Sequence, residues 1–226
     1  MESLNRLKQV FLTGGTGYLG SRLIPLLAQR GYGVRTLVRE SSRRRLPAGC
    51  EPVIGDPLDA RTFVDHVRRA DTFVQLVGTP KPAPWKGEQF RAVDRRSGLA
   101  SIDAARQVGV DHFIYVSVAH PAPIMNDYIA VRLECEAALR ESAQCATILR
   151  PWYILGPGHW WPALLKPAYW LCKRLPTTRE SAARLGLVTI EQMLCAILWA
   201  MDHPPNHVHV INVPEIRRLG GVPAPG

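Results

Sequence analysis

Several features that would assign a function class directly are missing from this 226-residue sequence. The five cysteines are widely spaced and form no C-x-x-C pair, so neither a zinc site nor a redox dithiol is indicated, and buried thiols in a reducing compartment are expected. No signal peptide precedes the first apolar segment, which predicts a cytoplasmic protein. The most apolar stretch, residues 160–175, is broken by prolines and basic residues and is too short to span a bilayer. We expect it to be buried, to form an oligomer contact or to lie on a membrane surface.

Acidic residues are fewer than basic ones, 19 against 28, which gives a formal net charge of +9. Such an excess can indicate nucleic-acid binding. The cations are spread along the chain, however, and only residues 43–45 form a tight arginine cluster. An anionic cofactor would use part of this charge, so a small-molecule ligand is favoured over a nucleic-acid partner.

Apolar runs of strand length alternate with amphipathic stretches of helix length through the first two thirds of the chain. This alternation is typical of βαβ units and predicts a Rossmann-type, doubly wound parallel sheet in the α/β class. The predicted strands are residues 8–12, 34–38, 52–54, 72–77, 113–116 and 146–149. The predicted helices are residues 18–30, 58–68, 88–107 and 127–142.

The rhythm changes after Pro151, where tryptophan, proline and glycine become frequent. We predict helices at 161–173 and 190–201, a last strand at 207–213, and a loose tail from Arg217. The domain division that follows is a dinucleotide-binding domain at 1–155, a small, mostly helical extension of it at 156–216, and a flexible tail at 217–226.

A glycine-rich run follows the first predicted strand and opens the first predicted helix. It fits G-x-G-x-x-G, and the strand-to-helix context gives this pattern its meaning. Glycines permit the tight turn and the close approach of backbone to phosphate, while helix amino-terminal amides face the anion. We predict that the pyrophosphate of a nicotinamide dinucleotide contacts Gly14, Gly15, Thr16, Gly17, Tyr18, Leu19 and Gly20. A tight turn without a ligand is the alternative.

The choice between NAD and NADP depends on the end of the second strand. An NAD site usually has an acidic residue there, which holds the ribose 2′-hydroxyl. Arg39 occupies that position, and a guanidinium suits a 2′-phosphate, so NADP is favoured over NAD. If the strand end lies one residue later, Glu40 takes the acidic position and NAD is indicated instead. The arginines at 43–45 are either phosphate contacts or part of a solvated loop. Asp56, after the third strand, is either an adenine contact or a turn residue.

The chain resembles the short-chain dehydrogenase/reductase superfamily, in its atypical branch of NmrA-like proteins and relatives of the complex I accessory subunit. The resemblance rests on residues 13–20, 37–39, 55–56, 74–78, 115–117, 128–132 and 149–158. It implies that Arg39 holds the adenosine phosphate and that Asp56 lies by the adenine. It further implies that Leu76, Val77 and Gly78 pass beneath the ribose, and that Pro151, Trp152 and Tyr153 lie near the nicotinamide.

Active members of this superfamily use serine with a Y-x-x-x-K pair, in which tyrosine moves the proton. Here the pair is Tyr128 and Arg132, with arginine in place of lysine, and Ser117 ends the fifth strand. The i, i+4 spacing places both side chains on one helix face. Arginine supplies charge but differs in shape from lysine. The catalytic candidates are therefore Ser117, Tyr128 and Arg132. The alternative is that Ser117 only ends a strand and that Tyr128 and Arg132 pack together without taking part in chemistry.

Three functions are compatible with these residues. The first is an NAD(P)-dependent oxidoreductase acting on a small, apolar carbonyl or alcohol. The second is a non-catalytic NAD(P)-binding redox sensor or assembly factor, which the missing lysine favours. The third is a basic RNA-binding protein on a Rossmann scaffold. No metal site is predicted, because His207 and His209 have no third ligand nearby in the sequence.

Overall fold

A computed structural model gives the structure of the protein and describes residues 7–158 and 184–221. Seven parallel strands form one sheet in the order β3-β2-β1-β4-β5-β6-β9. Their bounds are β1 Gln9–Thr13, β2 Gly33–Val38, β3 Glu51–Ile54, β4 Thr72–Gln75, β5 His112–Val116, β6 Ala146–Arg150 and β9 Val208–Asn212. The predicted Rossmann-type fold is confirmed, and each predicted strand lies within two residues of an observed one.

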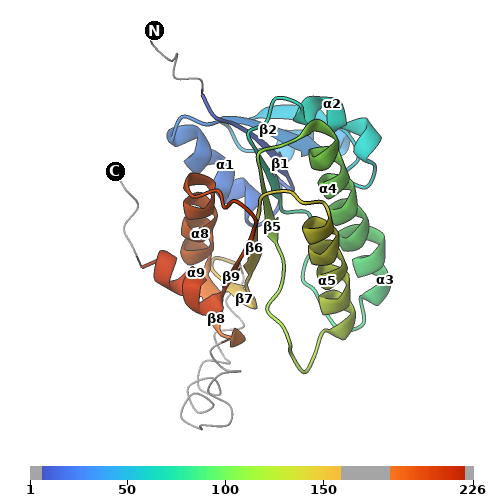
Figure 1. Ribbon diagram of the computed structural model, residues 1–226, viewed down its shortest axis with the longest axis vertical. Coiled ribbons are helices and arrows are strands. Elements are labelled where there is room, and N and C mark those ends of the chain that lie inside the picture. The colour runs from blue at the N-terminus through green and yellow to red at the C-terminus, as the bar shows by residue number, and fades with distance from the viewer. Residues whose placement is uncertain (1–6, 159–183, 222–226) are drawn as a thin grey trace.

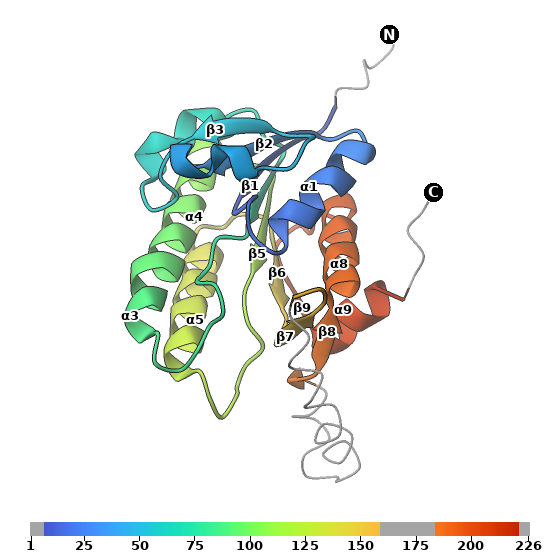
Figure 2. The same cartoon turned by 180° about the vertical axis from the view of Figure 1, so that it is seen from behind.

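Helices cover both faces of the sheet (Figures 1 and 2). One face packs against α1 (Gly20–Gln29), α8 (Ile190–Asp202) and α9 (Val213–Leu219). The other packs against α2 (Val64–Val67), α4 (Arg96–Val108) and α5 (Asn126–Glu141). The central strands are buried on both sides, as their nearly continuous apolar sequences require.

Two predicted helices differ from the observed ones. The segment predicted as a helix at 58–68 is a short 3₁₀ turn, η2 (Ala60–Thr62), followed by the single α-helical turn of α2. The helix predicted at 88–107 consists of α3 (Gly87–Gln89), a π-helical segment η3 (Phe90–Arg95) and α4. The π-helical segment underwinds the chain locally, which hydrophobic periodicity at 3.6 residues per turn does not predict.

The carboxy-terminal part contributes more regular structure than the sequence predicts. Tyr153–Leu155 (β7) and Leu187–Thr189 (β8) form a second, two-stranded parallel sheet. The loose tail predicted from Arg217 is wrong for its first three residues, which belong to α9. Helix α9 forms because Pro214 suits a helix amino terminus and because Ile216 and Leu219 bury one face. The helix predicted at 161–173 lies outside the described residues.

Candidate functional site

The glycine run forms a tight connection between β1 and α1. Gly14 has φ +78°, and a Cβ there would lie 2.7 Å from the carbonyl carbon of Leu76. A Cβ on Gly20 would collide with the backbone of Gly14 and Gly15, so strand and helix touch directly. These are the close approaches that the glycine pattern predicts. The run thereby lies against the carboxyl end of β4, beside the predicted ribose contacts.

The amino terminus of α1 is suited to an anion. Leu19 occupies its N-cap position without a side-chain cap, and no acidic residue lies in the first turn. Gly17, in the turn itself, is exposed. An uncapped helix amino terminus has partial positive charge, so this loop fits a pyrophosphate.

Arg39 is exposed directly after β2, and its carbonyl accepts from the Ser42 amide at 2.8 Å. This bond opens the 3₁₀ segment η1 (Glu40–Arg45), on which Glu40 and the three arginines at 43–45 are also exposed. Arg45 Nη2 donates to Ser42 Oγ at 2.6 Å. A basic surface thus follows the strand end at which the sequence predicts a 2′-phosphate.

Asp56 lies in a turn after β3. Its Oδ1 accepts from the Leu58 amide at 2.9 Å, and its own amide donates to Thr62 Oγ1 at 2.9 Å. The turn interpretation of Asp56 therefore matches the geometry. Its exposure leaves the carboxylate accessible for the adenine contact as well.

Gly78 lies between the predicted ribose contacts and the catalytic candidates. A Cβ on Gly78 would lie 2.6 Å from Arg132 Nη2 and 3.1 Å from Asp94 Oδ1. The strand end predicted to pass beneath the ribose therefore packs directly against the Arg132 guanidinium.

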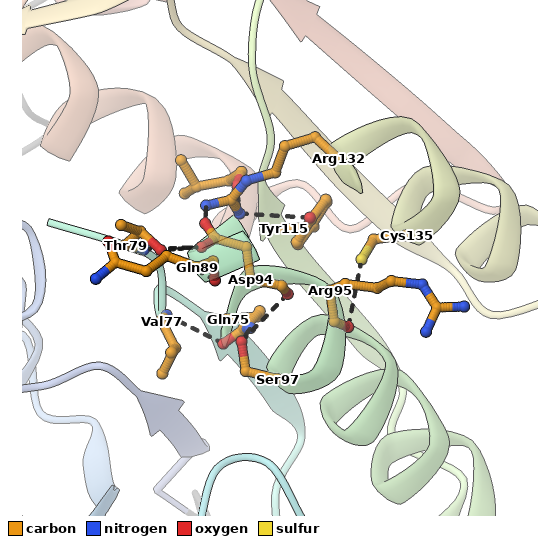
Figure 3. Close-up of polar contacts among 11 residues, drawn as sticks. Gln75, Val77, Thr79, Gln89, Asp94, Arg95, Ser97, Tyr115, Arg132 and Cys135 are labelled. Atoms are coloured by element: carbon orange, nitrogen blue, oxygen red, sulfur yellow. Dashed lines mark hydrogen bonds and ion pairs between the residues drawn. The ribbon is translucent and has the colours of Figure 1, made fainter. Parts of the chain in front are cut away.

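Arg132 is held by protein groups on several sides (Figure 3). Its Nη2 donates to Asp94 Oδ1 at 2.6 Å, and its Nη1 donates to the Val116 carbonyl at 2.9 Å and to the Tyr115 hydroxyl at 3.3 Å. Its guanidinium carbon lies 5.0 Å from the centre of the Tyr128 ring. The structure therefore brings Tyr128 and Arg132 together, in a cation–π contact.

The environment of Tyr128 favours its neutral form. Burial raises the pKa of the Tyr128 hydroxyl above its usual value. The charge of Arg132 lowers this pKa, but the nearby Asp94 carboxylate raises it again. Burial lowers the pKa of Arg132, but the Asp94 carboxylate and the hydrogen bond to Tyr115 raise it, so the guanidinium remains protonated. The net effect is a phenol that keeps its proton and can donate it.

Asp94 is a site residue that the sequence interpretation missed. It is fully buried on the π-helical segment η3, where its Oδ2 accepts from the Thr79 amide at 3.0 Å and from Thr79 Oγ1 at 2.5 Å. A buried carboxylate requires such partners. A π-helical segment is frequent at functional sites. The sequence signal that could have indicated Asp94 is Arg132 itself, because a buried guanidinium requires a carboxylate as its partner.

Ser117 is buried and belongs to a second network. The Glu136 carboxylate accepts from Ser117 Oγ at 2.6 Å, from Arg150 Nε at 2.9 Å and from Arg140 Nη2 at 3.0 Å. Burial raises the pKa of Glu136, but the bonds from Arg150 and Ser117 outweigh it and lower the pKa overall. An ionised carboxylate only accepts, so Ser117 donates its single proton to Glu136. In this arrangement Ser117 can accept a hydrogen bond from a substrate but cannot donate one.

Aromatic side chains gather beside Tyr128. Its ring centre lies 4.9 Å from that of Phe90, and both belong to an apolar cluster with Met125 and Trp152. Trp152 also meets Tyr153 edge to face at 5.4 Å. Pro151 is tied to this region by its carbonyl, which accepts from the Ala119 amide at 2.8 Å. The aromatic residues at 160, 161, 169 and 170 lie outside the described residues.

A family model described as NAD(P)H-binding matches residues 14–158. The chain belongs to this NAD(P)H-binding family. The chain is 32% identical over 151 residues to the ceramide reductase of Caulobacter vibrioides, a match that covers 66% of this chain and 47% of that protein. It is 26% identical over 144 residues to the photosystem II assembly factor Ycf39 of Trieres chinensis, covering 62% and 44%. This chain thus spans about half the length of these curated relatives.

The fold is similar to that of the Bordetella bronchiseptica enzyme WbmH, whose structure is a complex with NAD+. The TM-score is 0.68 at 21% identity, covering 95% of this chain and 79% of that one. The fold is also that of a solved short-chain dehydrogenase/reductase superfamily protein from Agrobacterium tumefaciens with bound NAD, at 19% identity and a TM-score of 0.66, and the family match agrees with the NAD(P)-binding fold that the resemblance implies. Within the described residues, no helix is both long and apolar enough to cross a membrane.

Proposed function

We propose that this protein is an NADP-dependent oxidoreductase that reduces an apolar carbonyl or oxidises the corresponding alcohol. The observation that carries the proposal is the position of Gly78, which packs against the Arg132–Asp94 pair and follows the strand end that contacts Gly14. Gly78 therefore connects the predicted ribose contacts to Arg132, which contacts the ring of the proton donor Tyr128. The aromatic cluster around Tyr128 suits an apolar substrate. One relative is a ceramide reductase, which supports an apolar substrate.

The glycine run would hold the pyrophosphate, and Arg39 the adenosine phosphate. When bound, the dinucleotide supplies or accepts the hydride. In the reducing direction, the Tyr128 hydroxyl gives its proton to the substrate oxygen as the carbonyl carbon receives the hydride. The positive charge of Arg132 stabilises the phenolate that remains, and solvent then returns the proton. Asp94 keeps the guanidinium against the Tyr128 ring.

The test is turnover of NADPH against a panel of apolar ketones by the wild type and by Tyr128→Phe. We expect the variant to lose at least about 100-fold in kcat, because general acid catalysis contributes a factor of this order. NADPH affinity should stay unchanged. Tyr32→Phe is the matched control, because Tyr32 donates to the exposed Asp202 on the α1–α8 face. Full activity in Tyr128→Phe would remove Tyr128 from the mechanism.

A non-catalytic role is the second candidate, and specific contacts favour it. Arg132 is occupied by Asp94 and by a backbone carbonyl, and the proton of Ser117 is donated to Glu136. A redox sensor or assembly factor would bind NADPH tightly and oxidise none of it. One relative is named as an assembly factor. Tight NADPH binding by the wild type without turnover on the whole panel would decide for this role.

A further inference from the structure

Two loops at the carboxyl edge of the sheet expose large apolar side chains. Trp85, between β4 and α3, is 82% exposed, and Ile124, between β5 and α5, is 48% exposed. Tryptophan is highly buried on average, so an indole that stands almost entirely in water calls for an explanation. No fold contact of the described residues explains this position.

The two loops end at the same place. They leave the neighbouring parallel strands β4 and β5, and both run down to the lower end of the molecule, where α3 and α5 begin (Figures 1 and 2). Gly87 packs so closely on Asp127 that a Cβ would collide with the carboxylate, and Arg91 lies 4.0 Å from the same group. Trp85 precedes Gly87 by two residues and Ile124 precedes Asp127 by three. Both exposed residues therefore belong to one tip, formed by the loop ends on either side of the contact between Gly87 and Asp127.

Proline stiffens this tip. The first loop contains Pro80, Pro82 and Pro84, and the second contains Pro121 and Pro123. Each proline fixes its own φ, so the loops have little conformational entropy to lose on binding. The backbone that carries the exposed side chains is thus already fixed before a partner binds.

Charge distinguishes the tip from a plain apolar patch. Lys81 and Lys86 flank Trp85, and Lys86 Nζ donates to the Pro80 carbonyl at 3.0 Å, which closes the loop on itself. Of the acidic groups nearby, Asp127 faces Arg91, while Glu88 is exposed. A tryptophan between lysines is the composition of segments that lie in a membrane interface.

We propose that this tip, formed by Trp85, Ile124, Lys81 and Lys86, docks on the surface of a lipid bilayer that carries anionic headgroups. The indole and the isoleucine enter the interface, and the lysines meet the headgroups. Met125, next to Ile124, is buried with Phe90 in the cluster that includes Tyr128. Docking therefore places the aromatic site directly behind the membrane contact. Membrane docking of this kind does not depend on catalysis.

The test is flotation of the full chain with phosphatidylcholine vesicles, with and without phosphatidylserine. We expect binding to the anionic vesicles and a loss of more than about tenfold in Trp85→Ala/Ile124→Ala, because two inserted side chains lose their apolar burial. Lys81→Ala should weaken binding about fivefold, the effect of one basic residue at an anionic surface. Leu7→Ala is the matched control, because Leu7 is 61% exposed but precedes the opposite end of β1.

Several results would overturn the proposal. Absence of wild-type flotation would refute it, as would flotation that the double variant leaves unchanged, which would place the membrane contact elsewhere in the chain. Equal binding to neutral vesicles would refute the role of the lysines. Concentration-dependent self-association that is lost in Trp85→Ala, without flotation, would make the tip a contact between copies. Trp85→Phe should retain most of the binding, since an aromatic ring remains at the interface.

Discussion

The buried pair of Asp94 and Arg132 gives the sharpest test of the site's architecture. The side chains are 0% and 6% exposed, and their Oδ1 and Nη2 atoms lie 2.6 Å apart. Replacing Asp94 with asparagine keeps the shape but leaves the guanidinium without its counter-ion. Breaking a buried pair on one side costs about 3–5 kcal/mol. For a urea slope of about 3 kcal/mol per molar, the unfolding midpoint of Asp94→Asn should fall by about 1–1.7 M.

The assay is equilibrium unfolding in urea, followed by far-UV circular dichroism. The double variant Asp94→Leu/Arg132→Met should recover much of the loss, because apolar residues of similar size can replace a buried ion pair at little cost. Asp65→Asn is the control: its partner Arg68 lies at 3.1 Å, but both side chains are exposed, and the expected loss is about 1 kcal/mol or less. Equal midpoints for wild type and Asp94→Asn would refute the reasoning that this pair is desolvated and integral to the fold.

Three further outcomes are expected. Gly14→Ala should abolish NADPH binding and lower Tm in a thermal-shift assay, because its Cβ would collide with the backbone at the end of β4. Gly109→Ala is the control: Gly109 has φ +69° and open space around it, so the variant should lose only about 1–2 kcal/mol to backbone strain and still bind NADPH. Arg39→Ala should weaken NADPH binding at least about tenfold in fluorescence titrations and leave NADH unaffected, with Arg44→Ala nearly neutral; equal losses for both nucleotides would contradict a 2′-phosphate contact. Burial lowers the pKa of His112 to about 4, so its stabilising effect is complete above about pH 6.5 and is lost as pH falls toward 4. The loss should reach about 3 kcal/mol in urea titrations and disappear in His112→Asn.

The parallel sheet was predictable because its signals are local. Each strand is a short apolar run, and Gly14 and Gly20 stand where strand and helix meet. β7 and β8 were missed because each has only three residues and pairs across more than 30 positions of sequence. The π-helical segment was missed because apolar periodicity averages over several turns.

The polar core of the site was not predictable in the same way. Arg132 and Glu136 are four residues apart on α5, a spacing that favours a pair between them. Instead Arg132 pairs with Asp94, on another element, while Glu136 pairs with Arg150 on β6 as well as with Arg140 on its own helix. Which charged residue of a helix turns inward depends on partners brought by the tertiary fold. The sequence indicated that Tyr128 and Arg132 share a face, but not what neutralises the arginine.

The π-helical segment η3 also fixes the angle between two of its side chains that contact α5. Phe90, at its start, meets the Tyr128 ring, and Asp94, one turn later, meets Arg132. If the same residues were wound as an ordinary α-helix, each would turn by about 100° instead of the smaller step of a π-helix, and Phe90 would rotate relative to Asp94. The two side chains could then no longer meet Tyr128 and Arg132 at the same time, although neither had changed. The wider winding of this turn therefore sets the angle between the two contacts, and a substitution that favours ordinary α-helical winding there would disturb the site without touching a residue that lines it.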